Sequence, residues 1–280
     1  MKPNIRLIDE LSEFEKLALQ NFSYSRLNTF DWCQAQYFYN YVLQIPQEPS
    51  DKALLGNMIH KAIELTLRDG EVLDKSELLD NYRGAREEYD PEEKYVSDEL
   101  FETGFPMLED FVARQGVGKA KITSPEFEFS FVFNGVLIRG YIDYLLVTED
   151  SVLLSDYKSG AWEVANKDVP TNLQLGIYAL YMKYLHPDKK ITAQLHYLKS
   201  DKVKKHVYED KDFEEIETRL AEAIDRVREN NNFVPLPKGL AWKCKMCSYQ
   251  KDGTCKAGRF NVEQAEKKKN RLISYDPQPL

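Results

Sequence analysis

Two carboxylates and a lysine are the residues whose types and spacing best predict chemistry in this chain. Asp156 follows Asp143 by thirteen residues, and Lys158 stands two residues further on. Carboxylate oxygens are ligands that hard cations such as Mg²⁺ and Mn²⁺ prefer, and Mg²⁺ usually takes one or two of them together with phosphate oxygens of a substrate. A lysine beside such a cation can orient or deprotonate an attacking water molecule. The three residues therefore predict a site that hydrolyses a phosphodiester.

The sequence around these residues predicts three consecutive β-strands, over residues 126–133, 136–147 and 152–157. The first alternates apolar and polar side chains, and the second is rich in β-branched and aromatic residues. Asn134-Gly135 between them is a tight-turn signal. Because side chains two residues apart leave the same face of a strand, Asp156 and Lys158 point the same way, and Asp143 can lie opposite them on the neighbouring strand.

Four short motifs occur in one order along the chain: Gly56–Glu64, Gly140–Asp143, Asp156–Gly160 and Gln174–Tyr178. An Asp-x-Lys element alone is weak evidence, because it occurs by chance in many chains. All four in this order, with three strands between the first helix and the last, are specific. Together they resemble the RecB-type branch of the PD-(D/E)XK nuclease superfamily. The resemblance implies an α/β fold with a restriction-endonuclease-like core, a mixed central sheet flanked by helices, to which helical additions and an iron–sulfur clasp are attached.

The resemblance implies a role for each residue around the predicted cation. The carboxylates of Asp143 and Asp156 would ligate the metal, with the backbone carbonyl of Tyr157 as a further ligand. His60, on the upstream helix, would supply another. Lys158 would position or activate water and stabilise the charge that develops on the phosphate.

Two residues of the last motif complete the predicted catalytic set. Gln174 and Tyr178 are four residues apart and therefore share one helix face. By resemblance, they flank the active site and touch DNA. Glu64 shares the face of the upstream helix that carries the histidine, and its role stays open. We expect Glu126 and Glu128 on opposite faces of their strand, so that at most one points toward the site, and the sequence does not decide which.

Four cysteines form a second group of candidate ligands. Cys244, Cys247 and Cys255 are close in sequence, whereas Cys33 lies more than two hundred residues upstream. Residues 1–11 are charged and lack the apolar core of a secretory signal peptide, so we expect a cytoplasmic location. In a reducing cytoplasm such cysteines bind metal more often than they form disulfides. Four thiolates suit either a structural Zn²⁺ or an iron–sulfur cluster, and their spacing does not separate the two.

The arrangement of one early cysteine and three late ones resembles the iron–sulfur staple of AddB-type nucleases and of the small CRISPR-adaptation exonucleases. Residues 23–33 also look like the start of that family, although Gln34 replaces the usual proline and the last gap between cysteines is longer than common. The resemblance implies a [4Fe–4S] cluster on all four cysteines, with Zn²⁺ as the alternative. Metal bonds that close a loop of about 200 residues remove much chain entropy from the unfolded state, so the cluster would act as a structural clasp.

Length and composition fit one nuclease core with helical additions rather than two independent domains. The chain has 280 residues, 42% of them hydrophobic, and no apolar run approaches the length of about 18 residues that a membrane span needs. The predicted parts are an N-terminal helical segment with the first cysteine (1–53), the nuclease core (54–235) with an acidic helical insertion (about 70–116), a cysteine-rich segment (236–262) and a polar tail (263–280).

Further helices and strands are predicted around the three central strands. Periodicity and capping residues indicate helices over residues 23–42, 54–68, 172–184 and 213–228, helical structure over 74–116, and strands over 191–199 and 204–208. The order helix, three strands, helix, strand is the core order of the family that the motifs resemble.

Charge is unevenly distributed along a chain whose net charge is −8. Residues 69–110 hold 15 acidic and 4 basic side chains, whereas residues 238–271 hold 10 basic and 3 acidic ones. The basic segment is as consistent with a phosphate-binding surface as with a solvated face. Net acidity does not argue against a nuclease, because its cation ligands are carboxylates and its DNA track can be local.

The residues and the resemblance together predict a metal-dependent DNA nuclease, an exonuclease that hydrolyses phosphodiester bonds at single-stranded or frayed ends. The expected partners are DNA ends and a helicase, recombinase or integrase, and no membrane is expected. Recombination, repair and CRISPR adaptation all use such a domain, so the biological setting stays open. The alternative is a DNA-end-binding and processing subunit of a larger complex with little activity alone.

Overall fold

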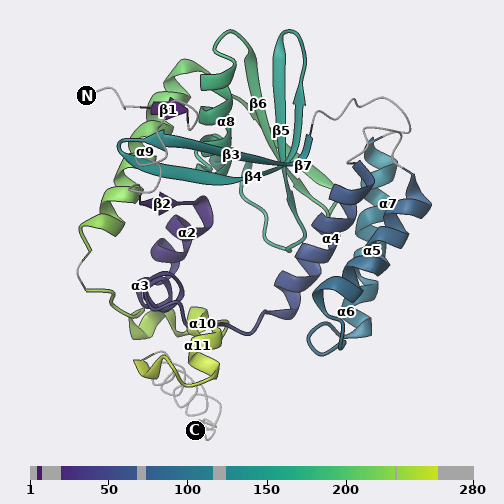
Figure 1. Cartoon of the computed structure of the whole chain (residues 1–280), viewed down its shortest axis with the longest axis vertical. Helices are drawn as coiled ribbons and strands as arrows, with labels where there is room; N and C mark the ends of the chain where they lie inside the picture. Colours follow the sequence, from purple (N-terminus) through teal and green to yellow (C-terminus); the bar gives the residue numbers. More distant parts are fainter. Residues whose placement is uncertain (1–4, 8–19, 68–73, 116–123, 231, 258–280) are drawn as a thin grey trace, which may run out of the picture. The chain divides into compact units, whose positions relative to one another are not determined.

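The computed structural model describes residues 5–7, 20–67, 74–115, 124–230 and 232–257 (Figure 1). The chain divides into two compact units. The first comprises Met1–Tyr24 and Pro49–Glu222, and the second comprises Ser25–Glu48 and Ala223–Leu280. The central sheet belongs to the first unit, and the four cysteines belong to the second.

The first unit is built on a mixed sheet, whose described strands run in the order β1-β3-β4-β5-β6-β7. Their bounds are Ile5–Leu7 (β1), Ser124–Phe133 (β3), Val136–Val147 (β4), Ser151–Lys158 (β5), Lys190–Tyr197 (β6) and Lys202–Val207 (β7). Neighbouring strands are antiparallel except β5 and β6, which are parallel. A short strand, β2 (Asn21–Phe22), pairs with β4 in parallel. The predicted mixed central sheet with flanking helices is confirmed.

Helix α8 (Leu173–Leu185) joins the parallel strands β5 and β6. A parallel pair needs such a crossover connection. The side chain of Asn172 caps the first turn of α8. The rings of Tyr178 and Tyr181 pack against Phe129 of β3, with centroids 5.5 and 5.2 Å from it. The helix of the last sequence motif is therefore held against the sheet.

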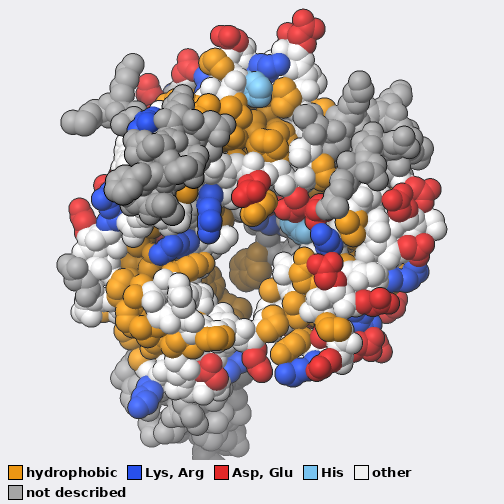
Figure 2. All heavy atoms as spheres, in the orientation of Figure 1, with side chains coloured by type: hydrophobic (Ala, Val, Ile, Leu, Met, Phe, Trp, Pro, Cys, Tyr) orange, Lys and Arg blue, Asp and Glu red, His pale blue; other side chains and the backbone are white. Residues whose placement is uncertain are grey.

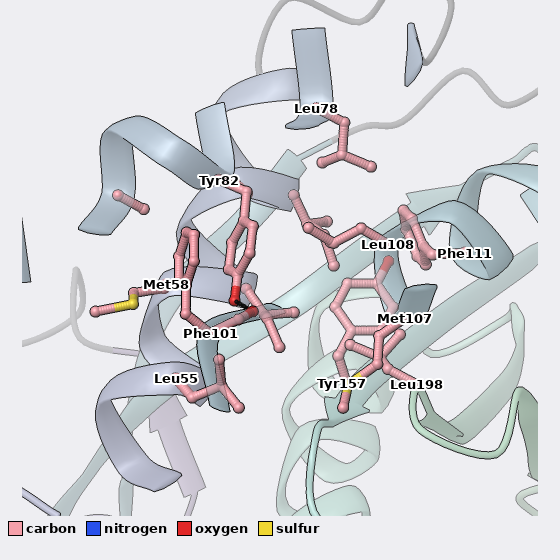
Figure 3. Packing of buried hydrophobic residues seen from close by; sticks show 14 of the residues in the cluster. Leu55, Met58, Leu78, Tyr82, Phe101, Met107, Leu108, Phe111, Tyr157 and Leu198 are labelled. Carbon is pink, nitrogen blue, oxygen red and sulfur yellow. Dashed lines mark hydrogen bonds between the residues drawn. The ribbon is translucent and has the colours of Figure 1, made fainter. Parts of the chain in front are cut away.

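Helices α4 to α7 pack on one another and bury a shared core (Figures 1 and 3). Their bounds are Asp51–Leu67 (α4), Lys75–Tyr89 (α5), Asp98–Glu102 (α6) and Gly104–Gln115 (α7). Tyr82 stacks on Phe101 with ring centroids 4.4 Å apart, and its hydroxyl donates a hydrogen bond to the Phe101 carbonyl. Figure 3 shows that Tyr157 of β5 belongs to the same cluster as Met107 and Leu198. The helical layer thus anchors the strand that carries the Asp-x-Lys element.

The acidic stretch of the sequence lies on the outer faces of these helices. Figure 2 shows acidic side chains gathered over the region of α5 and α7. Asp90 differs, because it is buried and accepts hydrogen bonds from the backbone N–H groups of Lys94, Tyr95 and Val96. Its carboxylate therefore closes the turn that follows α5, as buried polar groups require partners.

The predicted single helix over residues 23–42 is interrupted at Cys33. Tyr24–Trp32 (α2) is followed by Gln34–Tyr37 (α3) and by a π-helical turn, Phe38–Val42 (η2). Cys33 has an extended backbone, with φ −163° and ψ 114°. Since an extended residue does not continue a helix, the prediction was wrong at this position, and the cysteine stands at the break between two helices.

Aromatic packing joins the two sequence segments of the second unit. Phe233 stacks with Tyr37 and Phe38, with ring centroids 5.9 and 5.1 Å apart. The hydroxyl of Tyr249 donates a 2.6 Å hydrogen bond to the side chain of Asn40. The cysteine-rich segment contributes two short helices, Ala241–Cys244 (α10) and Ser248–Lys251 (α11). The described residues of the two sequence segments of the second unit therefore pack together.

The predicted elements of the first unit are found within a few residues of their expected bounds, whereas β1 and β2 were not predicted. The predicted polar tail, residues 263–280, lies outside the described residues, as does part of the basic segment. In the part of the chain that the structure describes, no helix combines the length and the apolar character needed to cross a membrane.

Gly176, within α8, allows close approach to the helix α9 (Asp210–Arg228). A Cβ atom at Gly176 would lie 2.8 Å from Cγ1 of Ile216, a buried side chain of α9. We expect Gly176→Ala to lower the free energy of unfolding by about 1–3 kcal/mol, because overpacking forces neighbours to move. Urea denaturation followed by circular dichroism measures this change.

Gly84→Ala is the matched control, because Gly84 is also inside a helix but a Cβ there would meet nothing within 4 Å. This substitution should raise the free energy of unfolding by about 0.5–1 kcal/mol, through helix propensity alone. Equal effects of the two substitutions would contradict the close packing of α8 on α9.

Candidate active site

Five elements of the first unit bring the predicted site residues together. The residues are His60 on α4, Glu126 on β3, Asp143 on β4, Asp156, Tyr157 and Lys158 on β5, and Gln174 and Tyr178 on α8. Strands β4 and β5 pair as far as Tyr144 and Ser155, so Asp143 and Asp156 occupy the next position along the two strands. The N–H of Tyr157 donates a 2.5 Å hydrogen bond to Oδ2 of Asp143. The predicted proximity of the two aspartates follows from this register.

His60, Glu126 and Asp143 form a group that could hold a metal ion. Each offers one ligand atom, and the three atoms lie within 4.8 Å of one another. Nδ1 of His60 is 3.5 Å from Oδ1 of Asp143 and 3.8 Å from Oε1 of Glu126. Nε2 of the same ring lies 3.1 Å from the carbonyl oxygen of Tyr157. One imidazole nitrogen and carboxylate oxygens suit Mn²⁺ or Mg²⁺ in ligand chemistry.

Glu126 is the member of this group that the sequence left undecided, with Glu128 as the alternative. The expectation that Glu126 and Glu128 lie on opposite faces was wrong in its reason, since residues two apart share one face of a regular strand. Glu126 instead has a positive φ of 46°, and it is left out of the β3–β4 pairing between Pro125 and Phe127. Its side chain reaches His60, whereas Glu128 is exposed. A positive φ at a glutamate leaves no signal in the sequence.

The charge of His60 depends on its acidic neighbours. Burial by itself lowers the pKa of His60, but Asp143 and Glu126 outweigh that effect and raise the pKa to about 10. The imidazole is therefore a cation at neutral pH in the metal-free chain. A metal ligand must be a neutral imidazole, so a bound cation has to displace a proton.

Asp156 is buried beside Lys158, with 2.7 Å between Oδ2 of the aspartate and Nζ of the lysine. Burial and the negative charge of Asp143 raise the pKa of Asp156 to about 6, although Lys158 opposes them. Asp156 is not part of the group of three ligand atoms within 4.8 Å that the described residues contain. Its role as a metal ligand stays a prediction.

A chain of polar contacts runs from Lys158 to α8. Nζ of Lys158 donates a 2.8 Å hydrogen bond to Oε1 of Gln174, and Nε2 of Gln174 donates a 2.9 Å hydrogen bond to the hydroxyl of Tyr178. Burial lowers the pKa of Lys158, but Asp156 and Asp143 outweigh it and the pKa is raised. Lys158 is therefore an oriented cation, suited to a developing negative charge more than to proton abstraction.

Comparison with protein families decides the assignment of the chain. A family model described as the PD-(D/E)XK nuclease superfamily matches residues 21–251, which is more than half of the sequence. The chain belongs to the PD-(D/E)XK nuclease superfamily. Members of this superfamily are nucleases that use divalent metals such as Mg²⁺ or Mn²⁺.

Comparisons with solved structures and with curated proteins give no further information on function. One similar solved structure is the crystal structure of SSO0001, with 13% sequence identity over 70% of this PD-(D/E)XK chain and 82% of that one, and a TM-score of 0.32. Because identity and TM-score are both low, we infer nothing from this likeness. The comparison with curated proteins gave no match.

The four cysteines of this PD-(D/E)XK chain come together in the second unit. All four line one small cavity, whose wall includes Tyr39. Burial raises the pKa of the Cys244 thiol, and the three other cysteines raise it further. Among the described residues, no three cysteine sulfurs lie within 4.8 Å of one another.

Displacement of the His60 proton is measurable. We expect Mn²⁺ binding to release about one proton per ion near neutral pH, and Mn²⁺ affinity to rise as the pH approaches 10, the pKa of His60. Because the raised pKa keeps the proton on the metal-free site, affinity falls by up to about tenfold for each unit of pH below it. Calorimetry in two buffers of different ionisation enthalpy measures the proton count.

His60→Gln should remove the proton release and weaken Mn²⁺ binding, since glutamine has no proton to exchange. His186→Gln is the control, because burial and then Lys189 lower the pKa of His186, which is already neutral at this pH. Unchanged proton release in His60→Gln would show that His60 is not displaced by the metal.

Proposed function

We propose that this chain is a metal-dependent deoxyribonuclease that acts as an exonuclease on single-stranded or frayed DNA ends. The observation that carries the proposal is the convergence of His60, Glu126 and Asp143 beside Asp156 and Lys158, in a member of a nuclease superfamily. The four motifs also resemble the RecB and AddB branch, which supports action at ends. Recombination, repair or CRISPR adaptation in a reducing cytoplasm, with a helicase, recombinase or integrase as partner, would follow from that resemblance.

Each residue has a defined task in the proposed hydrolysis. A divalent cation, when bound by His60, Glu126, Asp143 and Asp156, would polarise the phosphate and lower the pKa of a nearby water molecule. Lys158 would orient that water for in-line attack on phosphorus and stabilise the charge that develops on the phosphate oxygens.

Gln174 and Tyr178 hold Lys158 in position while leaving its positive charge in place. Gln174 accepts a hydrogen bond from Lys158 and is itself fixed by Tyr178. Tyr178 is buried, and burial followed by the charge of Asp156 raises its pKa well above the ordinary value. The tyrosine therefore remains a neutral hydroxyl, and we assign Gln174 and Tyr178 to positioning of the lysine and contact with the DNA strand.

We also propose that the four cysteines hold a [4Fe–4S] cluster that clasps the two segments of the second unit. The support is their common cavity, and the raised pKa values of Cys244 and Cys247, which burial causes first and the neighbouring cysteines second. Four thiolates in one place need a cationic centre to balance them, and a cluster of four irons fills a wider space than one zinc ion. Zinc remains the alternative occupant.

Lys158→Ala tests the nuclease proposal. Anaerobically purified protein is incubated with end-labelled single-stranded and duplex DNA and Mn²⁺ or Mg²⁺. We expect metal-dependent shortening from one labelled end, and a rate at least about 100-fold lower in Lys158→Ala, because an oriented cation at the reacting phosphate is lost. Lys211→Ala, which removes an exposed lysine paired with Glu209, should keep the wild-type rate.

Two outcomes would contradict this assignment. Cleavage that persists in Lys158→Ala would point to a contaminant or to another site. Binding of DNA ends by wild type and variant without any cleavage would favour the alternative, an end-binding and processing subunit that needs a larger complex.

Metal analysis tests the cluster proposal. Anaerobically purified protein should be brown and contain about four irons per chain. Cys33→Ser and Cys244→Ser should each lose most of this iron, although the two cysteines belong to opposite ends of the sequence. About one zinc per chain in place of iron would establish the zinc-bound form instead.

A further inference from the structure

Trp162 is the most exposed large hydrophobic side chain of the described residues, with 90% of its surface open to solvent. It takes part in none of the hydrogen bonds or ring contacts found in the described part of the chain. Tryptophan is usually largely buried, because its ring is the largest apolar side chain. Single exposed apolar residues do occur on protein surfaces, so exposure alone assigns nothing to Trp162.

Trp162 lies close to the candidate active site along the chain. Trp162 follows Lys158 by four residues, on the loop that leaves the candidate site after β5. An extended chain covers at most about 3.6 Å per residue, so the two Cα atoms are no more than about 14 Å apart. That distance corresponds to a few nucleotides of a strand whose phosphate lies at Lys158.

The two residues that follow Trp162 are held by hydrogen bonds and ion pairs. The carboxylate of the next residue, Glu163, accepts hydrogen bonds from Ser200 and Lys202 and lies 3.0 Å from Nζ of Lys204. The N–H of Val164 donates a 2.8 Å hydrogen bond to the hydroxyl of a buried tyrosine of β6, and its carbonyl accepts one of 2.6 Å from Lys204. The residues that follow the ring are therefore tied to β6 and β7, while the ring itself stays in solvent.

The surroundings of the loop carry positive charge. Lys202 and Lys204 bring two cations to Glu163, which offsets one of them. The three hydrogen bonds to Glu163, with the Lys204 contact first, lower its pKa to about 2, so it is ionised and the pairing persists. An aromatic face held beside a net positive charge is the combination that binds single-stranded nucleic acid.

We propose that Trp162 is a stacking platform for an unpaired nucleobase of the DNA strand, a few nucleotides from the phosphate at Lys158. The proposal rests on the nuclease function proposed above and specifies how the substrate is recognised. A base can stack on Trp162 only where it is not paired, so the platform selects single-stranded or frayed ends. Because every base has an aromatic face, the selection is tolerant of sequence. Because Glu163 and Val164 are already held by β6 and β7, this loop would lose little conformational freedom when DNA binds.

Binding of two fluorescently labelled strands tests the proposal. One is an oligothymidylate, and the other has the same backbone with abasic sites in place of the bases. The full-length protein is titrated in EDTA, so that no cleavage occurs, and fluorescence anisotropy gives the affinity. We expect Trp162→Ala to bind the oligothymidylate about 5- to 100-fold more weakly than wild type, and the abasic strand equally well.

Two variants serve as controls. Trp162→Phe keeps an aromatic face and should recover most of the affinity for the oligothymidylate. Tyr184→Ala removes another exposed aromatic side chain, on α8, and should leave binding of both strands unchanged. Thermal melting of Trp162→Ala should match that of the wild type, because the ring is exposed.

Each other result overturns the stacking role in a distinguishable way. Equal losses on both strands in Trp162→Ala would show that the ring acts on the backbone or on the fold. Unchanged DNA binding together with a changed oligomeric state would assign Trp162 to a protein interface. In both cases cleavage that depends on Lys158 would leave the nuclease proposal intact. A wild-type protein that neither binds nor cuts DNA would overturn both proposals.

Discussion

The divergence of β4 from β5 is the constraint on which the candidate active site depends. The two strands pair as far as Tyr144 and Ser155, and Asp143 and Asp156 occupy the next position, where the pairing ends. β5 continues beside β6. The N–H of Tyr157 then donates to the Asp143 side chain. This hydrogen bond gives the Tyr157 N–H a partner where the pairing of β4 with β5 ends, and it holds the Asp143 carboxylate in place.

The charges of the acidic and basic residues at the candidate active site nearly balance one another. Asp143, Asp156 and Glu126 bring three negative charges when ionised, against which the metal-free chain has the cations of His60 and Lys158. The remaining excess of negative charge is consistent with the raised pKa of Asp156, although burial is its larger cause. With a neutral imidazole and one divalent cation, the three carboxylates and the lysine balance. Buried charges are stable only when they are paired in this way.

Much of the fold could be predicted because its signals are local. Alternation and turn residues gave the central strands, and the spacing of Asp156 and Lys158 placed both on one strand face. The position of His60 came from resemblance, since its partners lie far away in sequence. The choice between Glu126 and Glu128 stayed open, because the positive φ of Glu126 has no sequence signal. The break at Cys33 was missed because the flanking residues are compatible with one continuous helix.

The proton on His60 has a consequence for how the protein matures. The imidazolium of His60 supplies positive charge beside Asp143 in the metal-free chain, so these ionic contacts do not require the divalent ion. The thiols of Cys244 and Cys247 behave in the opposite way, because burial, and then the neighbouring cysteines, raise their pKa values and favour the protonated form. Their set is also incomplete until Cys255 has been made, more than two hundred residues after Cys33. With a metal on the cysteines, as proposed, the second unit would depend on the cell's metal supply for its completion, whereas the ionic contacts of the candidate active site would not.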